Sequence, residues 1–293
     1  PRTEKQKFED AKREVLQEYG IDEEKLKKGI LYDKKLGDDG FNKLINFIPN
    51  DVPKLWLDFN DLSVESVKTL AKNLPPKILG LNLNINNLGD EGAKELAKIL
   101  PDNLQVLSLD QNEIGDDGAI ALAANLPSKL THLILNLNNI GHKGATALAK
   151  KLPKGLQYLS LGGNRVGQNG TKALAKKLPN SLLSLQLYEN NITDAGAKAL
   201  AKNLQDNLQV LSLDENEIGD EGAKALANKL PSNLKQLMAN FNEIGPDGAA
   251  ALAKKLPNGL EVLSLGGNRI REKGTGALAK KLPNSLRELG LYE

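Results

Sequence analysis

The sequence predicts an α/β solenoid whose 26-residue units each contribute one short parallel strand and one helix. The first observation is the pattern LxxLxLxxNxI at residues 104–114, and the second is its recurrence at a constant spacing. Such a period is typical of a solenoid, because one unit cannot bury its apolar face without its neighbours. The third observation is an apolar helical pattern after most copies. The copies begin at Val52, Ile78, Leu104, Leu130, Leu156, Leu182, Leu208, Leu234, Leu260 and Leu286.

Each copy opens with leucines that alternate with variable residues, as at Leu107 and Leu109. This period of two predicts a short strand whose leucines point into a core. An asparagine such as Asn112 follows where the strand must turn, and its amide can both donate to and accept from nearby backbone. We therefore expect the repeated asparagines to form a buried structural ladder without a role in ligand binding. They are Asn60, Asn86, Asn112, Asn138, Asn164, Asn190, Asn216, Asn242 and Asn268.

The second half of each copy predicts an amphipathic helix. In the copy that starts at Ile78, Asp90 stands at the helix start, Lys98 near its end and Pro101 at its stop, an order that complements the helix dipole. The apolar positions at helical spacing are Ala93, Leu96, Ala97 and Leu100. Because helices are about 10 Å wide and strands pair at about 4.8 Å, the stack must curve toward its strands. We expect a horseshoe with a concave parallel sheet and convex helices.

Residues 1–51 predict a helical N-terminal cap that includes a degenerate repeat. Residues 1–20 fit a helix with a capping box from Thr3 to Gln6 and a stop at Gly20. Residues 26–51 keep only part of the pattern, which is common for terminal repeats of solenoids. The predicted repeat domain is then 52–293, with ten repeats of which the last is incomplete. The apolar stripe expected to cover the open end of the first repeat is Phe8, Ala11, Val15 and Tyr19.

Composition excludes several classes of function. The formal net charge of +2 indicates no bulk polyanion as partner, and a mean hydropathy of −0.37 without a long apolar run predicts no membrane span. The absence of cysteine excludes disulfides, thiolate zinc sites and a cysteine nucleophile, and it fits a cytosolic protein. The chain starts at Pro1 and ends inside a repeat strand, so we expect a fragment of a longer protein.

The variable strand positions are expected to point out of the concave face, with two further positions at its rim. Across the ten repeats these positions carry eleven acidic residues, Glu293 included, and three basic residues, so the predicted face is acidic. Lysine pairs such as Lys150 and Lys151 make the helical back basic. We interpret these pairs as a solvated face, because nucleic-acid binding would require aromatic residues among them.

We predict that a protein partner binds this concave face. The candidate residues are Trp56, Asp58, Phe59, Asn84, Asp110, His132, Ile134, Asn136, Tyr158, Tyr188, Glu189, Asp214, Glu215, Met238 and Phe241. Aromatic and aliphatic anchors set among carboxylates favour a partner with a basic, partly apolar surface. For Trp56 and Phe59, packing against the cap helix remains an alternative to contact with a ligand.

No catalytic constellation is apparent in the sequence. The two histidines, His132 and His142, stand in no spacing that is typical of a metal site or a catalytic triad. A grouping of His132 with Asp110 and Ser108 is expected by chance in a repetitive surface. We therefore predict no enzymatic activity, no metal and no cofactor.

The repeat unit, with its Gly-Ala-x-Ala-Leu-Ala core at residues 222–227, resembles ribonuclease-inhibitor-like leucine-rich repeats and in particular the GALA-type repeats of translocated bacterial effectors. The resemblance covers 52–293 and implies a binding module secreted by a bacterium into a host cell. The chain lacks the cysteines of the inhibitor family, and residues 1–51 show no F-box of the kind that such effectors often carry. Fold resemblance alone does not determine function.

Three functions are compatible with the sequence. We expect a monomeric protein-interaction module of an effector that binds a host protein. The alternative is the substrate-recruiting part of a larger enzyme, such as a ubiquitin-ligase adaptor, and the third is a structural or surface protein.

Overall fold

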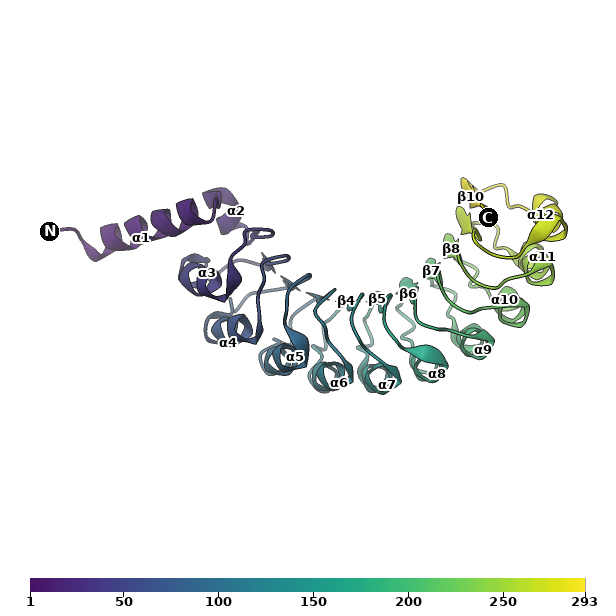
Figure 1. Cartoon of the computed structure of the whole chain (residues 1–293), viewed down its shortest axis with the longest axis horizontal. Coiled ribbons are helices and arrows are strands. Elements are labelled where there is room, and N and C mark those ends of the chain that lie inside the picture. The colour runs from purple at the N-terminus through teal and green to yellow at the C-terminus, as the bar shows by residue number, and fades with distance from the viewer. Residues whose placement is uncertain (293) are drawn as a thin grey trace. The chain divides into compact units, whose positions relative to one another are not determined.

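The computed structural model describes residues 1–292, which form two compact units, Pro1–Asn138 and the residues from Asn139 onward. Glu293, which contributes to the predicted acidic face, lies outside the described residues. In each unit a short strand alternates with a helix, as the repeat pattern predicts (Figure 1).

The first unit opens with three helices and a 3₁₀ turn and continues with four strands and three helices. The opening elements are α1 (Glu4–Glu18), α2 (Glu23–Lys27), α3 (Gly37–Leu44) and η1 (Ile45–Phe47). The repeats follow as β1 (Lys54–Trp56), α4 (Val64–Asn73), β2 (Gly80–Asn82), α5 (Gly89–Ala97), β3 (Val106–Ser108), α6 (Asp116–Ala124) and β4 (His132–Ile134). The strands pair in parallel in chain order, with Leu55 beside Leu81 and Leu81 beside Leu107.

The second unit consists of repeats with the same alternation. Its elements are α7 (His142–Lys151), β5 (Tyr158–Ser160), α8 (Gly167–Ala175), β6 (Ser184–Gln186), α9 (Asp194–Asn203), β7 (Val210–Ser212), α10 (Asp220–Ala227), β8 (Gln236–Met238), α11 (Pro246–Lys255), β9 (Val262–Ser264), α12 (Arg271–Ala279) and β10 (Glu288–Gly290). The strands are parallel, and equivalent residues of consecutive repeats lie side by side, as Leu159 and Leu185 do. Within each unit the strands lie on the inner side of the curve and the helices on the outer side (Figure 1).

The core consists of the predicted leucines and of small residues on the helices. Leu107, Leu109 and Leu122 are fully buried, and Ala119 packs from the helix into the same layer. Helix contact with the sheet through alanine and leucine keeps the helices close to the strands. The predicted alternation of inward leucines is confirmed.

The asparagine ladder is also confirmed. Asn86 Oδ1 accepts hydrogen bonds from the Asn60 N–H at 3.1 Å and the Leu62 N–H at 2.9 Å, while its Nδ2 donates to Leu57 O at 3.1 Å and Leu83 O at 2.9 Å. Each asparagine thus pairs backbone groups of adjacent repeats that would otherwise be unsatisfied. Eight of the nine are buried, and Asn268 is half-buried.

One helix boundary differs from the prediction. The helix expected to run to Pro101 ends at Ala97, and Leu100 lies beyond it and is half-buried.

The N-terminal capping box is present, because the Gln6 N–H donates to Thr3 Oγ1 and the Thr3 N–H donates to Gln6 Oε1. The apolar stripe of α1 covers less than expected, since α1 extends past its neighbour α3. Ala11 is exposed, and Phe8 is 48% exposed with a ring contact of 5.0 Å to Phe47.

Candidate functional site

All fifteen predicted binding residues lie on the strand face or at its rim, and each is partly or fully exposed. The first unit carries Trp56, Asp58, Phe59, Asn84, Asp110, His132, Ile134 and Asn136, and the second carries Tyr158, Tyr188, Glu189, Asp214, Glu215, Met238 and Phe241. The two groups therefore belong to separate compact units, and each unit presents its own set of outward side chains.

The serines at outward strand positions are an exception to the predicted pattern. They are buried, although the alternation places them on the solvent side, and they include Ser108, Ser160, Ser212 and Ser264. Ser108 stands between the longer side chains of Asn82 and Ile134 on the adjacent strands, and its Oγ donates to Asn84 Oδ1 at 2.8 Å. Serine at this position therefore acts as a spacer between larger residues.

Trp56 packs along the sheet over the adjacent strand. Its ring carbon lies 3.1 Å from the position that a Cβ on Gly80 would occupy, so the indole covers the glycine of the next strand. Lys54 Nζ lies 5.6 Å from the ring centroid, within the range of a cation–π interaction. The indole is consequently held in place as a half-buried platform, while Phe59 is 56% exposed.

Carboxylates at the ends of the strands form a second ladder. Asp110 Oδ1 accepts the Asn136 N–H at 2.6 Å, and in the second unit Asp214 Oδ1 accepts the Asn240 N–H at 2.6 Å. Burial raises the pKa of both carboxyls, and these hydrogen bonds only partly oppose that shift. Burial and the neighbouring Asp33 also raise the pKa of Asp58. These acids are thus positioned by the fold but incompletely compensated, so a cation should be attracted to them.

His132 has the environment of a surface strand residue. Its Nδ1 lies 2.8 Å from Thr131 Oγ1, and partial burial lowers the pKa of the imidazole, which favours the neutral form near pH 7. Within residues 1–292 no group of three or more histidine, aspartate and glutamate side chains is arranged to hold a metal ion.

In the second unit, aromatic rings lie over glycines of the preceding repeat. The Tyr188 ring comes within 2.1 Å of the position of a Cβ on Gly162, so only glycine fits beneath it. Tyr292 covers Gly266 in the same manner, and Phe241, 5.9 Å from the Tyr292 ring, lies against Gly267 of the following repeat. Glycine at these positions is the sequence signal that could have identified the rings as fixed platforms.

The residue that precedes each buried asparagine adopts a left-handed backbone, which the sequence analysis missed. In the first unit the φ angles are 56° for Phe59, 54° for Ile85, 54° for Gln111 and 55° for Leu137. The conformation is fixed by the next repeat, since the Ile85 N–H donates to Asp110 O at 2.8 Å. Ile85 and Leu137 are 42% and 47% exposed and were not among the predicted site residues. Glycine at the equivalent positions 163 and 267 was the available signal.

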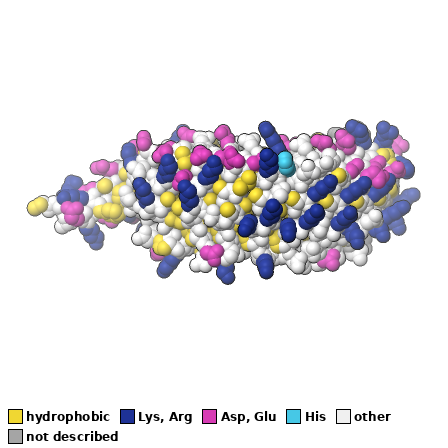
Figure 2. Space-filling view, turned by 90° about the horizontal axis from the view of Figure 1, so that it is seen from below, with side chains coloured by type: hydrophobic (Ala, Val, Ile, Leu, Met, Phe, Trp, Pro, Cys, Tyr) yellow, Lys and Arg dark blue, Asp and Glu magenta, His cyan; other side chains and the backbone are white. Residues whose placement is uncertain are grey.

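The helical back is basic but partly paired within helices. Lys94 contacts Glu91 at 2.9 Å, and Lys224 contacts Glu221 at 3.0 Å, each one helical turn apart. Figure 2 shows lysine and arginine side chains distributed over the face seen there, with apolar side chains between them. Exposed pairs of this kind contribute little to stability and are typical of a solvated surface.

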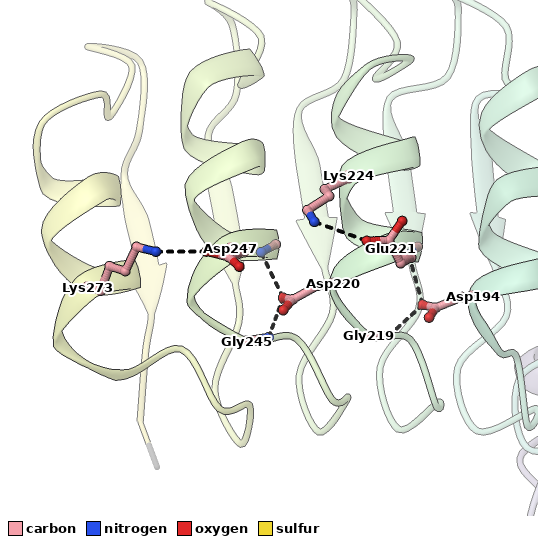
Figure 3. Close-up of polar contacts among 10 residues, drawn as sticks. Asp194, Gly219, Asp220, Glu221, Lys224, Gly245, Asp247 and Lys273 are labelled. Atoms are coloured by element: carbon pink, nitrogen blue, oxygen red, sulfur yellow. Dashed lines mark hydrogen bonds and ion pairs between the residues drawn. The ribbon is translucent and has the colours of Figure 1, made fainter.

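Acidic residues at the helix starts serve to connect repeats. Asp194 Oδ1 accepts the N–H groups of Gly219 and Gly222 at 2.8 and 2.9 Å, and Asp220 repeats this arrangement one helix further on (Figure 3). In the first unit Asp90 accepts from the starting residues of α6 in the same way. These carboxylates satisfy free N–H groups at a helix N-terminus and are structural.

Comparison with known proteins supports the repeat assignment. A family model described as Leucine Rich repeat matches residues 76–97, 102–123, 127–149, 179–201 and 206–227. No curated protein matches the chain. No helix among residues 1–292 is long and apolar enough to cross a membrane.

Solved structures share the fold at low sequence identity. The chain is similar to a protein in the crystal structure of the Rad7 and Elc1 complex from yeast, with a TM-score of 0.65, 20% identity, and coverage of 98% of this chain and 82% of that one. It is also similar to an internalin, InlF, from Listeria monocytogenes, with a TM-score of 0.55, 23% identity, and coverage of 87% and 70%. The matched segments, the parallel strands and the alternating helices together show that the chain is built from leucine-rich repeats.

Proposed function

We propose that this chain is a protein-binding module that contacts its partner through the strand face. The observation that carries the proposal is a set of exposed or half-exposed aromatic and aliphatic side chains fixed on short strands and surrounded by carboxylates. Trp56 and Tyr188 are held by the glycines beneath them, so ordering them on binding would lose little conformational entropy. Rigid aromatic residues of this kind are the commonest anchors of protein interfaces.

The charge of the face determines the class of partner. Asp110 and Asp214 have raised pKa values because burial leaves their ionised forms incompletely compensated, and Glu189 and Glu215 are exposed at the rim. A basic and partly apolar protein surface would compensate these acids, whereas a polyanion would be repelled. Charge of this type mainly accelerates association and selects the partner.

We propose binding without catalysis as the function of residues 1–292. A narrower form of the proposal, that the chain is part of a bacterial effector and works in the cytosol of a host cell, rests on the resemblance of residues 222–227 to GALA-type repeats. The alternative of a substrate-recruiting segment of a larger enzyme uses the same strand face. A catalytic domain in the complete reading frame would favour this alternative over a module that only binds.

The proposal can be tested with a captured partner and two matched pairs of substitutions. The partner would be isolated on the full chain, identified by mass spectrometry, and its binding measured by surface plasmon resonance. We expect Tyr158→Ala with Tyr188→Ala to weaken binding by about 2 kcal/mol or more. The control, Lys150→Ala with Lys151→Ala on α7, should leave affinity unchanged. Equal affinity for the tyrosine pair together with loss in the lysine pair would place the interface on the helices.

A further inference from the structure

An apolar ridge runs along the rim of the first unit. It consists of Phe59, Ile85 and Leu137, which are 56%, 42% and 47% exposed, and Gln111 occupies the fourth equivalent position. These residues occupy the same position in consecutive repeats, and adjacent parallel strands lie about 5 Å apart, so the ridge extends over about 15 Å. Exposed apolar residues are ordinary when scattered, but here they are aligned by the repeat.

The backbone of the ridge makes apolar residues unexpected. All four positions have φ between 54° and 56°, a left-handed conformation that β-branched residues such as Ile85 rarely adopt. The Phe59, Ile85 and Gln111 N–H groups donate to carbonyls of the next repeat at 2.8 to 2.9 Å, which prevents relaxation. Glycine is compatible with this position, as Gly163 and Gly267 show in the second unit. The same conformation is found at Glu189, Glu215 and Phe241, so it belongs to the repeat, and the exposed apolar side chains at three of the four ridge positions contribute no buried core.

Carboxylates flank the ridge on both sides. Asp58 and Asp110 lie on the strand side, and Asp61 and Glu113 are exposed on the loop side. Asp61 accepts a hydrogen bond from Asn87 Nδ2, and no lysine or arginine occurs at the corresponding ridge and flanking positions of the four repeats. Lys54, the basic residue at the outward strand positions of this unit, is engaged over Trp56. The ridge is thus an apolar line bordered by four carboxylates and four asparagines, with no lysine or arginine at these positions.

We propose that this ridge is the docking site for a protein segment whose apolar side chains are flanked by lysine or arginine. The inference rests on the proposed function and deepens it, since it specifies where on the first unit the partner binds and which residues of the partner are recognised. The apolar side chains of the segment cover Phe59, Ile85 and Leu137, and its cations pair with the flanking carboxylates. Charge complementarity selects this class of segment over an acidic or uncharged one.

The chain offers a closely matched control for the ridge. Ile120 is 43% exposed and Ile85 is 42% exposed, but Ile120 lies on α6 in the same unit, on the helical side. Substitution of Phe59 and Ile85 by glycine removes the apolar surface and places at both positions a residue that adopts positive φ without strain, so we expect the variant to fold. Circular dichroism during thermal unfolding would verify that the variant is at least as stable as the parent chain.

The test uses a phage-displayed library of random 15-residue peptides selected on the full chain. We expect the selected peptides to combine apolar residues with lysine or arginine, and Phe59→Gly with Ile85→Gly to weaken them at least tenfold by fluorescence anisotropy. Ile120→Ala should change affinity less than twofold, and Asp61→Asn with Glu113→Gln should weaken binding mainly at low salt.

Three results would overturn the proposal. The first is that no selected peptide binds, or that the peptides lack basic residues. The second is that the affinity of the peptides for the glycine variant stays within twofold of their affinity for the parent chain. If the same peptides lose affinity for the variant with Tyr158→Ala and Tyr188→Ala, the strand face binds them but the ridge does not. The third is a concentration-dependent dimer in sedimentation that the glycine variant abolishes, which would assign the ridge to a second copy of this chain.

Discussion

Asp220 fixes the backbone of Gly245 in the following repeat. Its Oδ1 accepts the Gly245 N–H at 2.8 Å, and Gly245 is extended with φ of −94°. Gly115 and Gly219 are extended in the same way beneath Asp90 and Asp194. The helix start is therefore set by a residue of the preceding helix.

Where Val64 or His142 takes the place of this carboxylate, the backbone turns the other way, whereas Thr193 stays extended at φ of −93° and donates through Oγ1 to Gln168 Oε1 at 3.1 Å. Val64 occupies the position of the carboxylate for Gly89, which has φ of +61°. His142 occupies it for Gly167, which has φ of +63°. Their N–H groups donate instead to a carbonyl of the next repeat, for example Gly89 N to Asn112 O at 2.9 Å. Each helix start thus has two conformations, and the available acceptor selects between them.

The first prediction concerns the carboxylate. Asp220→Ala removes the acceptor of two N–H groups at the start of α11, and we expect a loss of about 1–3 kcal/mol in the free energy of unfolding. Urea denaturation followed by circular dichroism measures this change. Asp220→Asn keeps an oxygen acceptor and should lose clearly less; equal losses would mean that packing, and not the hydrogen bonds, is responsible.

The second prediction compares two glycines at the same repeat position. Gly89→Ala should destabilise the chain by about 1–2 kcal/mol, because alanine is strained at φ of +61°. Gly219→Ala should be neutral or slightly stabilising, since φ is −101° and the new Cβ would meet Asp194 at an ordinary distance of 3.4 Å. Melting temperatures of the two variants test this prediction. A lower melting temperature for Gly219→Ala than for Gly89→Ala would contradict it.

The third prediction introduces the missing carboxylate. His142→Asp places an acceptor at the first residue of α7 and should allow Gly167 to adopt the extended conformation. Gly167→Ala should then be tolerated in the His142→Asp background but not in the parent chain, a coupling measurable by a double-mutant cycle. Additive effects of the two substitutions would show that residue 142 does not control the backbone at 167.

The fourth prediction concerns Asp110 and pH. Its pKa is raised by burial, so the ionised carboxylate weakens the fold at neutral pH, and stability is regained as pH falls from the raised pKa toward the ordinary value. Asp110→Asn preserves an acceptor, as Asn240 does by accepting the Gly266 N–H at 2.8 Å. We expect the variant to be at least as stable as the parent chain at pH 7. The advantage should shrink on acidification, and a pH-independent difference in the free energy of unfolding would contradict the assigned cause.

The fifth prediction tests our proposal that residues 1–51 cap the repeats. Leu16 and Leu26 are buried, and the Tyr19 ring lies within 2.9 Å of the position of a Cβ on Gly40. Deletion of residues 1–25 should expose Leu31 and Leu44 and cause aggregation or a large fall in melting temperature. A truncated chain that stays monomeric and equally stable in light scattering would show that the segment is an appendage.

The sequence was sufficient for features that repeat within one unit. The inward position of Leu107 and Leu109 follows from a period of two, and the burial of Asn112 follows from the need to satisfy backbone groups at the end of a strand. The left-handed backbone of Ile85 could not be predicted from its own residue type, because a carbonyl in the next repeat imposes it. The starts of α5 and α6 differ for a related reason, since the deciding residue lies one repeat earlier, at Val64 and Asp90.

The alternation of inward and outward side chains along each strand predicts which residues of the candidate site face outward, but not how their neighbours pack around them. Asp58 and Asp110 were correctly placed on the outward face, while Ser108 was misplaced because larger neighbours bury it. Packing of Trp56 over Gly80 depends on which residue stands opposite in the adjacent strand. That information is present in the sequence once the register between repeats is known.

The most direct test of the proposed function is hydroxyl-radical footprinting of the chain alone and with its captured partner. Trp56, Tyr158 and Tyr188 report on the strand faces, and Ile120 reports on the helical side with a similar degree of exposure. We expect protection of one or more of the three aromatic residues on binding and no change at Ile120. Protection of Ile120 with unchanged oxidation of all three aromatic residues would contradict binding through the strand face.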